Sequence, residues 1–260
     1  MLKFGYTKTY KSVIIRFFTW LFRKSDFKRL KLNYKLFENI LEHAINQHKQ
    51  EQKDKFIEAY LLIGNKLLVD TQSTKILSSL GLHGSTHVLL AVILRTVRMI
   101  GALHLESKLI DEYLDEEKTS DTNKGFRIKF SESSLQKILD GRFGKNERGE
   151  YANLDKALHG SSVGAKIYYA RIRHNTNGTK GGDITYDAFF EDEKSAAALN
   201  ILNGALLDAV GVYLERYQGD KSLVDLSKKY DHQIQSETKE MIKSALKVEL
   251  KDRFRGESKW

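Results

Sequence analysis

The sequence predicts a mainly α-helical bundle, and three observations lead to this fold class. Hydrophobic residues recur at the three-to-four-residue spacing of helices through most of the 260 residues, whereas the two-residue alternation of strands is rare. Proline is absent, although average usage would give roughly a dozen in this length, so helices must end at glycines or polar caps. With 41% hydrophobic residues, the chain has enough apolar content to build a core.

Cysteine is absent, which excludes disulfide scaffolds, thiolate zinc sites and cysteine nucleophiles and favours a reducing compartment. The longest early apolar run, Val13 to Phe22, contains Arg16 and has about half of the roughly 20 residues that span a bilayer. Basic residues follow this run, where a signal peptide would have a small-residue cleavage site. We therefore expect a cytoplasmic protein.

The positive charge is concentrated at one end of the chain. Residues 1–35 contain ten lysines and arginines and a single acid, Asp26, so this basic arm carries the entire net charge of +9. Such a segment suits nucleic acid, an anionic membrane surface or an acidic protein. Because the arm also holds nine aromatic residues, we expect it to bind single-stranded RNA through phosphates and base stacking. The candidate phosphate-binding residues here are Arg16, Arg23, Lys24, Lys28 and Arg29.

Helical spacing begins with a short amphipathic helix over residues 11–23. We favour docking of this helix on the protein core, and leave open a membrane-surface or nucleic-acid-binding role. A longer helix is predicted over residues 27–45, followed by a helix over residues 56–69 and a short one over residues 71–81.

The middle of the chain contains the most apolar segment. Ser85 is placed to cap a long, central helix over residues 87–117. Alternating apolar and basic residues over 126–130 predict a short strand, and Ser131 is placed to cap a helix that runs to Asp140.

Residues 141–153 contain three glycines and five charged residues and predict an exposed loop. We place the domain boundary there, between a helical region of residues 1–140 and a second helical region of residues 141–260. Turn residues at 175–183 must interrupt the helical pattern of the second region. The helices expected there cover residues 154–174, 192–217, 222–231 and 236–253.

Common catalytic motifs are missing: the sequence contains no phosphate-binding P-loop, dinucleotide fingerprint, serine elbow or HExxH. His83 and His87 have an i,i+4 spacing, but we expect Gly84 to break the helix between them and find no carboxylate nearby to complete a metal site. We expect neither a metal nor a cofactor. Arg98, six residues before a histidine in an apolar helix, is interpreted as structural.

Residues 154–217 carry the most informative pattern. A helical segment ends in Arg173, a polar residue and a glycine-containing loop follow, and the next helix opens with acidic and alanine-rich residues and carries Asn200. This arrangement resembles the abortive-infection C-terminal-like domain of the HEPN superfamily of helical bundles. The resemblance implies a component of a prokaryotic or phage-conflict defence system that binds RNA or cleaves it without a metal. It also implies a homodimer.

In the family, the arginine binds the scissile phosphate and a histidine four to six intervening residues later transfers a proton. The resemblance places Arg173 at the arginine position, but the histidine position falls on Gly178, Thr179 or Lys180. Catalysis would then use His174 as a shifted acid or base. Phosphate contacts are expected from Arg171, Asn175 and Lys180.

Because the usual histidine is missing, whether the protein is an enzyme stays open. The alternative is a non-catalytic HEPN-like adaptor or sensor that works through contacts with a partner protein. A protein held at a membrane surface by residues 11–24 is the least favoured of the three hypotheses.

Overall fold

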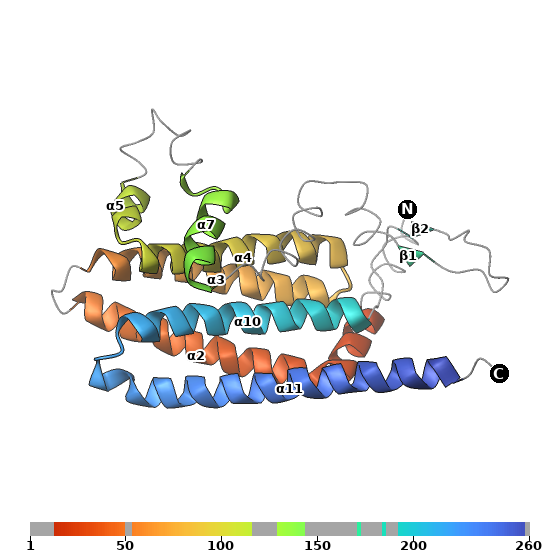
Figure 1. Ribbon diagram of the computed structural model, residues 1–260. Coiled ribbons are helices and arrows are strands. Elements are labelled where there is room, and N and C mark those ends of the chain that lie inside the picture. The colour runs from red at the N-terminus through yellow and green to blue at the C-terminus, as the bar shows by residue number, and fades with distance from the viewer. Residues whose placement is uncertain are drawn as a thin grey trace.

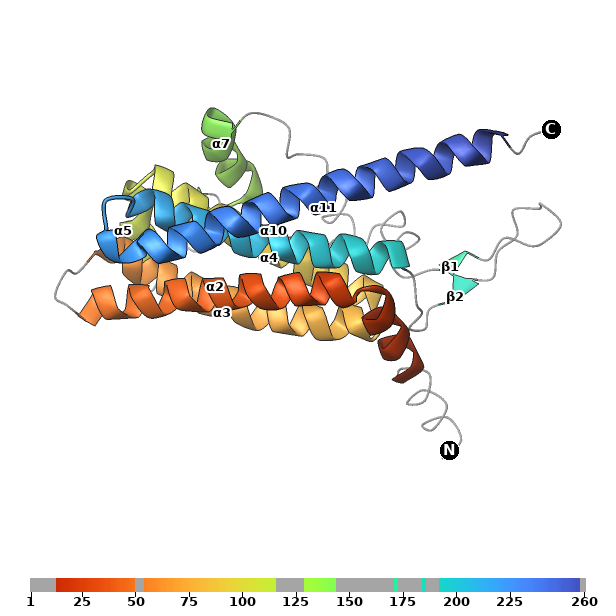
Figure 2. The ribbon, with the colours of Figure 1, turned by 90° about the horizontal axis from the view of Figure 1, so that it is seen from below.

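The computed structural model describes residues 13–49, 54–115, 129–143, 171–172, 184–185 and 192–257, and its fold is a mainly α-helical bundle (Figure 1). The predicted fold class is therefore confirmed. Seen from below, the long C-terminal helix runs along the bundle (Figure 2). The bundle helices are α2 (Lys24–Lys49), α3 (Lys55–Ser79), α4 (His83–Leu105), α10 (Asp192–Arg216) and α11 (Val224–Glu257).

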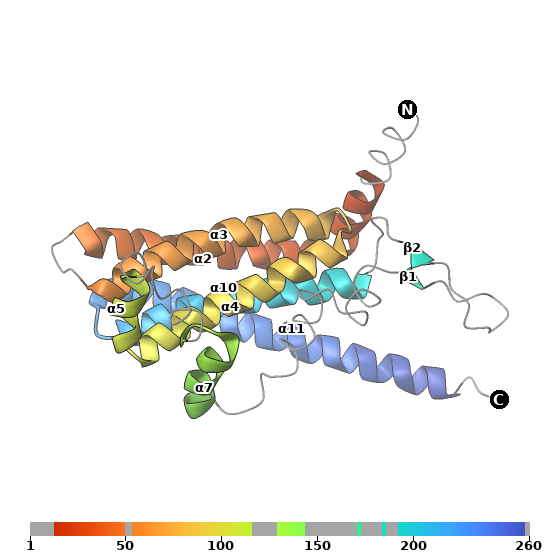
Figure 3. The same cartoon turned by 90° about the horizontal axis from the view of Figure 1, so that it is seen from above.

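Several shorter helices and one hairpin accompany the bundle helices. The Val13–Phe22 helix precedes α2, and α5 and α7 lie beside α4 (Figure 3). Strands β1 and β2 form a short antiparallel hairpin, in which Arg171 is opposite Thr185 and Ile172 is opposite Ile184. The bounds are α5 (Lys108–Leu114), α7 (Glu132–Phe143), β1 (Arg171–Ile172), β2 (Ile184–Thr185) and the 3₁₀ turn η4 (Lys221–Leu223).

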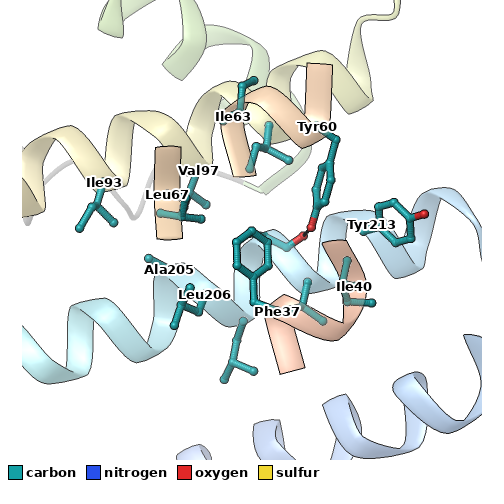
Figure 4. Packing of buried hydrophobic residues seen from close by; sticks show 14 of the residues in the cluster. Phe37, Ile40, Tyr60, Ile63, Leu67, Ile93, Val97, Ala205, Leu206 and Tyr213 are labelled. Carbon is teal, nitrogen blue, oxygen red and sulfur yellow. Dashed lines mark hydrogen bonds between the residues drawn. The ribbon is translucent and has the colours of Figure 1, made fainter. Parts of the chain in front are cut away.

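One hydrophobic core lies between α2, α3, α4 and α10. Phe37 of α2, Leu67 of α3 and Leu206 of α10 are all fully buried, and Figure 4 shows them directed toward the same space. The Tyr60 hydroxyl, also buried, donates a hydrogen bond of 2.8 Å to the Ala209 carbonyl of α10. Helices from both regions expected from the sequence, residues 1–140 and 141–260, therefore share this core.

Helices α2 and α3 approach each other closely at Gly64. A Cβ atom at this position would lie 2.6 Å from Cδ2 of Leu41 and 3.4 Å from the ring of Phe37. Because real Cβ atoms do not come this close to a neighbour, the absence of a side chain at Gly64 sets the packing distance between the two helices.

Helix α3 is continuous, so the prediction of separate helices over 56–69 and 71–81 was wrong. The polar residues after the expected break are accommodated inside the helix: the Thr74 hydroxyl donates to the Asp70 carbonyl one turn earlier, at 2.7 Å. A threonine that bonds to its own helix backbone adds no interruption. Asp54 caps the start of α3 by accepting from the Phe56 amide.

The central helix was predicted with the wrong ends. Helix α4 begins at His83 rather than after a Ser85 cap, and Thr86 donates to the Leu82 carbonyl within its first turn. It ends at Leu105, and the following residues form the separate helix α5 rather than a continuation to residue 117. Gly84 therefore does not separate His83 from His87, because both residues lie in α4.

The structure around α7 confirms one prediction from the sequence and contradicts another. The Ser131 Oγ accepts from the Ser134 amide at 3.3 Å, so the predicted capped helix is confirmed, although it extends to Phe143. The expected strand over 126–130 is wrong for Lys129, which is helical, and for Phe130, which lies in the turn before α7; residues 126–128 are outside the described residues. Phe130 is buried and is needed for the core.

In the second half, the predicted helix over 192–217 is confirmed as α10. The two helices expected over 222–231 and 236–253 are one helix, α11, which begins at Val224; residues 222–223 belong to the 3₁₀ turn η4. The helix expected over 154–174 does not reach its predicted end, because Arg171 and Ile172 belong to β1. Its remaining residues, like the predicted loop after Phe143, lie outside the described residues.

We expected the Val13–Phe22 helix to dock on the core, but most of its apolar side chains are not buried there. Ile15 and Thr19 are buried, whereas the large apolar residues on the other sides of this helix are 39–61% exposed. The spacing of apolar residues correctly indicated a helix, but it did not reveal that most of its apolar surface faces solvent.

Two of the described helices, α4 and the Lys194–Arg216 part of α10, are long and apolar enough to cross a membrane. About half of each such segment is buried by the neighbouring helices, which equally suits the core of a helical bundle.

Candidate nucleic-acid interface

Four lysines form a line on the solvent-facing side of α2. Lys24, Lys28, Lys31 and Lys35 are all exposed and are separated by four, three and four residues. This spacing keeps them within an arc of about 60° and spreads them over about 16 Å of helix. We call these four residues the lysine stripe; it lies opposite the buried face of α2 that contains Phe37.

Little negative charge accompanies the lysine stripe. Lys35 has an ion-pair contact of 3.9 Å with Glu38 of the same helix, and Lys24 lies 5.4 Å from the centre of the Trp20 ring. The contact with Glu38 is exposed and long, so it stabilises little. The stripe is therefore a surface of net positive charge that suits a chain of phosphates.

The lysine stripe borders a small cavity between α2 and α3. This cavity, of about 50 Å³, is lined by Lys31 and Tyr34 of α2 and by Thr71, Gln72 and Lys75 of α3, together with Leu30. The Thr71 hydroxyl is buried and has no hydrogen-bond partner. A buried hydroxyl left unpaired is unfavourable, and Thr71 lines the same cavity as Lys31 and Lys75. Cations and a hydroxyl donor together suit a phosphate oxygen.

The arginines and lysines predicted from the basic arm have different environments. Arg16 and Lys28 are exposed, and Arg23 lies 3.5 Å from the Asp26 carboxylate. Lys24 lies against the ring of Trp20. Arg29 differs from the other four because its guanidinium is engaged inside the protein.

Arg29 belongs to a polar network that joins α2, α10 and α11. Its guanidinium donates to Asp26 at 2.7 Å, to Glu237 of α11 at 2.7 Å and to Asn200 of α10 at 3.0 Å. Burial raises the pKa of the Glu237 carboxyl, and the charge of Arg29 acts in the opposite direction. A phosphate would have to displace these carboxylates, so Arg29 holds the bundle together rather than being available to a ligand.

A buried asparagine pair continues this network. Asn33 of α2 donates to the side-chain oxygen of Asn203 of α10 at 2.8 Å, and Asn203 donates to the Leu199 carbonyl at 2.9 Å. Asn200, singled out by the family resemblance, therefore lies one turn from a structural contact and itself accepts from Arg29.

The residues expected to carry cleavage are only partly described. Arg171 lies in β1, and the β1–β2 hairpin is found at the end of the bundle where α2 and α10 begin (Figures 1 and 2). Arg173, His174, Asn175 and Lys180 lie outside the described residues. Since the strand segment ends at Ile172, the arginine position of the family motif follows a strand rather than a helix.

A second polar cluster lies at the opposite end of α2. His43 Nδ1 is 3.0 Å from the Tyr213 hydroxyl, and its Nε2 is 2.8 Å from Ser222 Oγ and 3.3 Å from the Asp220 carboxylate. Burial raises the pKa of the Tyr213 hydroxyl, so Tyr213 keeps its proton. The Asp220 carboxylate can only accept, so Nε2 carries a hydrogen toward it and Nδ1 is left to accept from Tyr213.

This arrangement does not activate Ser222. With Nδ1 accepting, Nε2 carries the hydrogen of the neutral ring, and it points toward Ser222 and Asp220. Ser222 in turn donates to Asp220 at 2.6 Å. A nucleophilic serine needs a base to accept its proton, and Nε2 is not free to do so. The cluster ties the segment before α11 to α2.

The remaining histidine and arginine candidates have structural surroundings. His83 and His87 are buried, and His87 Nδ1 lies 2.6 Å from the His83 carbonyl. Among the described residues no three histidine, aspartate or glutamate side chains gather in a way that would hold a metal. Arg98 pairs with Glu132 and so connects α4 to α7, in agreement with the structural interpretation of this arginine.

Comparison of the chain with protein-family models, curated proteins and solved structures found no match in any of the three. The function is therefore inferred from the geometry of the surface.

Part of this surface was not predicted from the sequence. Lys31 and Lys35 were counted in the net charge but were not separated from the other basic residues, although their spacing from Lys24 and Lys28 already indicates one helix face. Thr71 and Lys75 carried no signal in the sequence, because only the packing of α3 on α2 brings them beside Lys31.

Proposed function

We propose that this protein binds single-stranded RNA along the lysine stripe of α2. The observation that carries the proposal is the alignment of four exposed lysines with one weakly paired acid, beside a cavity that contains a second-helix lysine and an unpaired hydroxyl. The lysine stripe is about 16 Å long, which is the length of a few nucleotides. Lysines in this arrangement neutralise successive phosphates without reading the bases.

Direct binding measurements test the lysine stripe. Fluorescence anisotropy of a labelled 20-nucleotide RNA, repeated over a range of KCl concentrations, gives both the affinity and its salt dependence. We expect Lys28→Gln/Lys31→Gln to weaken binding about tenfold or more and to reduce the salt slope by roughly 0.7 for each phosphate that a lysine no longer neutralises.

A matched control removes the same charge elsewhere. Lys137→Gln/Lys229→Gln changes two exposed lysines on α7 and α11 and leaves the lysine stripe intact. If this control weakened binding as much as the stripe variant, net charge rather than the stripe would explain binding. If the wild type bound no RNA, the alternative hypothesis of a non-catalytic adaptor would replace the proposal.

Thr71→Val tests the cavity separately. The substitution keeps the shape of the side chain and removes a buried hydroxyl that has no partner, so the free energy of unfolding should stay the same or rise by up to about 1 kcal/mol. RNA affinity should fall if this hydroxyl donates to a phosphate. Loss of stability together with loss of affinity would instead indicate a structural role for Thr71.

RNA cleavage is proposed on the family resemblance alone, together with a role in prokaryotic or phage-conflict defence and a homodimeric state. Arg173 would bind the scissile phosphate and His174 would transfer the proton. The β1–β2 hairpin, which flanks these residues in sequence, lies at the end of the bundle where α2 begins (Figure 2). Incubation of labelled RNA with the wild type, Arg173→Ala and His174→Ala tests cleavage, with Lys137→Gln/Lys229→Gln as the control.

A further inference from the structure

The Val13–Phe22 helix presents an apolar surface that no part of the described bundle covers. Seven aromatic and aliphatic side chains of this helix are exposed to solvent by more than a third of their surface. They are Val13 (61%), Ile14 (39%), Phe17 (56%), Phe18 (40%), Trp20 (49%), Leu21 (49%) and Phe22 (58%).

These seven side chains form one continuous surface. At 100° per residue they occupy an arc of about 200° around the helix axis. The rings of Phe17 and Phe18 are 5.9 Å apart, and those of Phe18 and Phe22 are 6.3 Å apart. The buried residues Ile15 and Thr19 lie beside this arc, on the side that faces the protein.

Positive charge borders the apolar arc. Arg16 and Arg23 lie on the remaining side of the helix, about 300° and 280° from Val13 on the same 100° spacing. Lys24 stands over the Trp20 ring at 5.4 Å. Residues 1–35 as a whole carry the entire net charge of +9. The occupant of this surface must therefore be apolar where it meets the arc and anionic at its border.

An anionic bilayer surface meets both requirements better than the other occupants. RNA bases would stack on the aromatic rings but would leave Val13, Ile14 and Leu21 in water. A second copy of the chain would bring two segments of charge +9 together. A protein groove generally takes the narrower stripe of residues at i, i+3, i+4 and i+7.

We infer that the Val13–Phe22 helix lies in the surface of an anionic lipid bilayer, with its apolar arc in the acyl region. Arg16, Arg23 and Lys24 then contact the lipid headgroups, and Trp20 lies at the boundary, where tryptophan is favoured. At about ten residues the helix is too short to span the bilayer, so it lies along the surface. This revises the expectation that contact with a membrane surface is the least favoured hypothesis.

The inference is tested separately from RNA binding: Lys24 belongs to both surfaces, but the variants used here change the apolar arc and leave the lysine stripe intact. Its test is co-sedimentation of the full chain with vesicles of phosphatidylcholine alone or with about 30% phosphatidylglycerol. We expect binding to the anionic vesicles, at least roughly tenfold weaker binding to the neutral ones, and weakening by added salt.

Variants distinguish vesicle binding by the Val13–Phe22 helix from non-specific binding by other exposed apolar residues. Phe17→Ser/Leu21→Ser should reduce vesicle binding at least roughly tenfold, because it removes apolar area that would enter the bilayer. The control Leu62→Ser/Val69→Ser changes two residues of α3 that are equally exposed, at 56% and 65%, and should leave binding unchanged. Circular dichroism would check that both variants remain helical.

Trp20 reports its own environment. In a Trp260→Phe protein, which has Trp20 as its single tryptophan, the emission should move to shorter wavelength when anionic vesicles are added. Absence of binding or of this shift would overturn the inference, as would equal loss of binding in the α3 control. Sedimentation equilibrium without lipid provides a further check: self-association abolished by Phe17→Ser/Leu21→Ser would identify a second copy as the occupant instead.

Discussion

The Val13–Phe22 helix and α2 are neighbours in the sequence and both belong to the basic arm. They expose different kinds of residue to solvent. The first exposes its apolar residues and buries little besides Ile15 and Thr19, whereas α2 buries its apolar residues and exposes four lysines. Backbone hydrogen bonds continue across the bend between them, from the Arg23 amide to the Thr19 carbonyl and from the Phe27 amide to the Arg23 carbonyl.

The difference has a geometric cause. Helix α2 lies in the bundle with α3, α10 and α11 around it, so its apolar face finds partners. The Val13–Phe22 helix bends away from the bundle at Arg23, and the described helices leave its apolar arc uncovered (Figure 2). An apolar face therefore predicts burial only where another element is available to cover it.

The largest expected effect compares phenylalanines of the two helices. Phe37→Ala removes a fully buried ring from the core and should lower the free energy of unfolding by about 3–5 kcal/mol. Phe17→Ala removes a ring that is 56% exposed and should change it by less than about 1 kcal/mol. Urea unfolding followed by circular dichroism measures both. Similar losses in the two variants would mean that the Val13–Phe22 helix is packed in solution.

The next effect compares adjacent basic residues of α2. Arg29→Met leaves the Glu237 carboxylate without its cation, while Asp26 keeps a longer contact of 3.5 Å with Arg23. It should destabilise the protein by about 2 kcal/mol, since the side chains of Arg29 and Glu237 are only 13% and 14% exposed. Lys28→Met, on the solvent-facing side, should stay within about 0.5 kcal/mol. The same unfolding assay applies. The double variant Arg29→Met/Glu237→Met should recover part of the loss, and a larger loss than Arg29→Met alone would contradict the ion-pair explanation.

The smallest expected effect is a pH dependence of the free energy of unfolding. It arises from two carboxyl groups, Asp220 and Glu237, that lie near the two ends of α2. Hydrogen bonds from Ser222 hold the pKa of Asp220 below its ordinary value of 3.8, so Asp220 stabilises the fold above that pH and this contribution is lost as the pH falls through the lowered pKa. Burial holds the pKa of Glu237 above its ordinary value of 4.5, so its contribution is fully present below pH 4.5 and is lost as the pH rises through the raised pKa.

Substitution of each carboxylate should therefore change the pH profile of stability in opposite directions. Asp220→Asn should make the loss of stability in acid less steep, whereas Glu237→Gln should remove a decrease in stability that begins above pH 4.5. Melting temperatures measured from about pH 3 to 7 test both signs. Parallel profiles for the two variants would show that these side chains do not titrate as their surroundings indicate. The Val13–Phe22 helix contains no acid, so Phe17→Ala should leave the profile unchanged.

Several parts of the fold followed from local patterns. Helix α10 and the Ser131-capped α7 were predicted because their hydrophobic spacing and polar starts are properties of neighbouring residues. Breaks were harder to predict: α3 continues through Thr71 and Thr74, and α4 contains Gly84, because burial in the bundle outweighs the weak helix preference of these residues.

The candidate site also combines features that follow from local sequence with features that depend on tertiary packing. Lys24 and Lys28 were identified from charge, and their alignment with Lys31 and Lys35 follows from helix geometry alone. The cavity with Thr71 and Lys75 required the packing of α3 on α2, which brings together residues that are about 40 positions apart in sequence, such as Lys31 and Thr71. The separation of Arg29 from the exposed lysines likewise depended on Glu237, more than 200 residues away.

By itself, the sequence determined that this protein is a mainly helical bundle whose positive charge lies at one end of the chain, because helix periodicity and charge are local properties that neighbouring residues settle. Only the tertiary structure decided which surfaces remain available. It buried the apolar face of α2, left that of the Val13–Phe22 helix uncovered by the described helices, engaged Arg29 with Glu237 and placed an unpaired Thr71 hydroxyl in the cavity beside Lys31. Each of these outcomes depends on which distant element packs against a given face, and no local pattern encodes that choice.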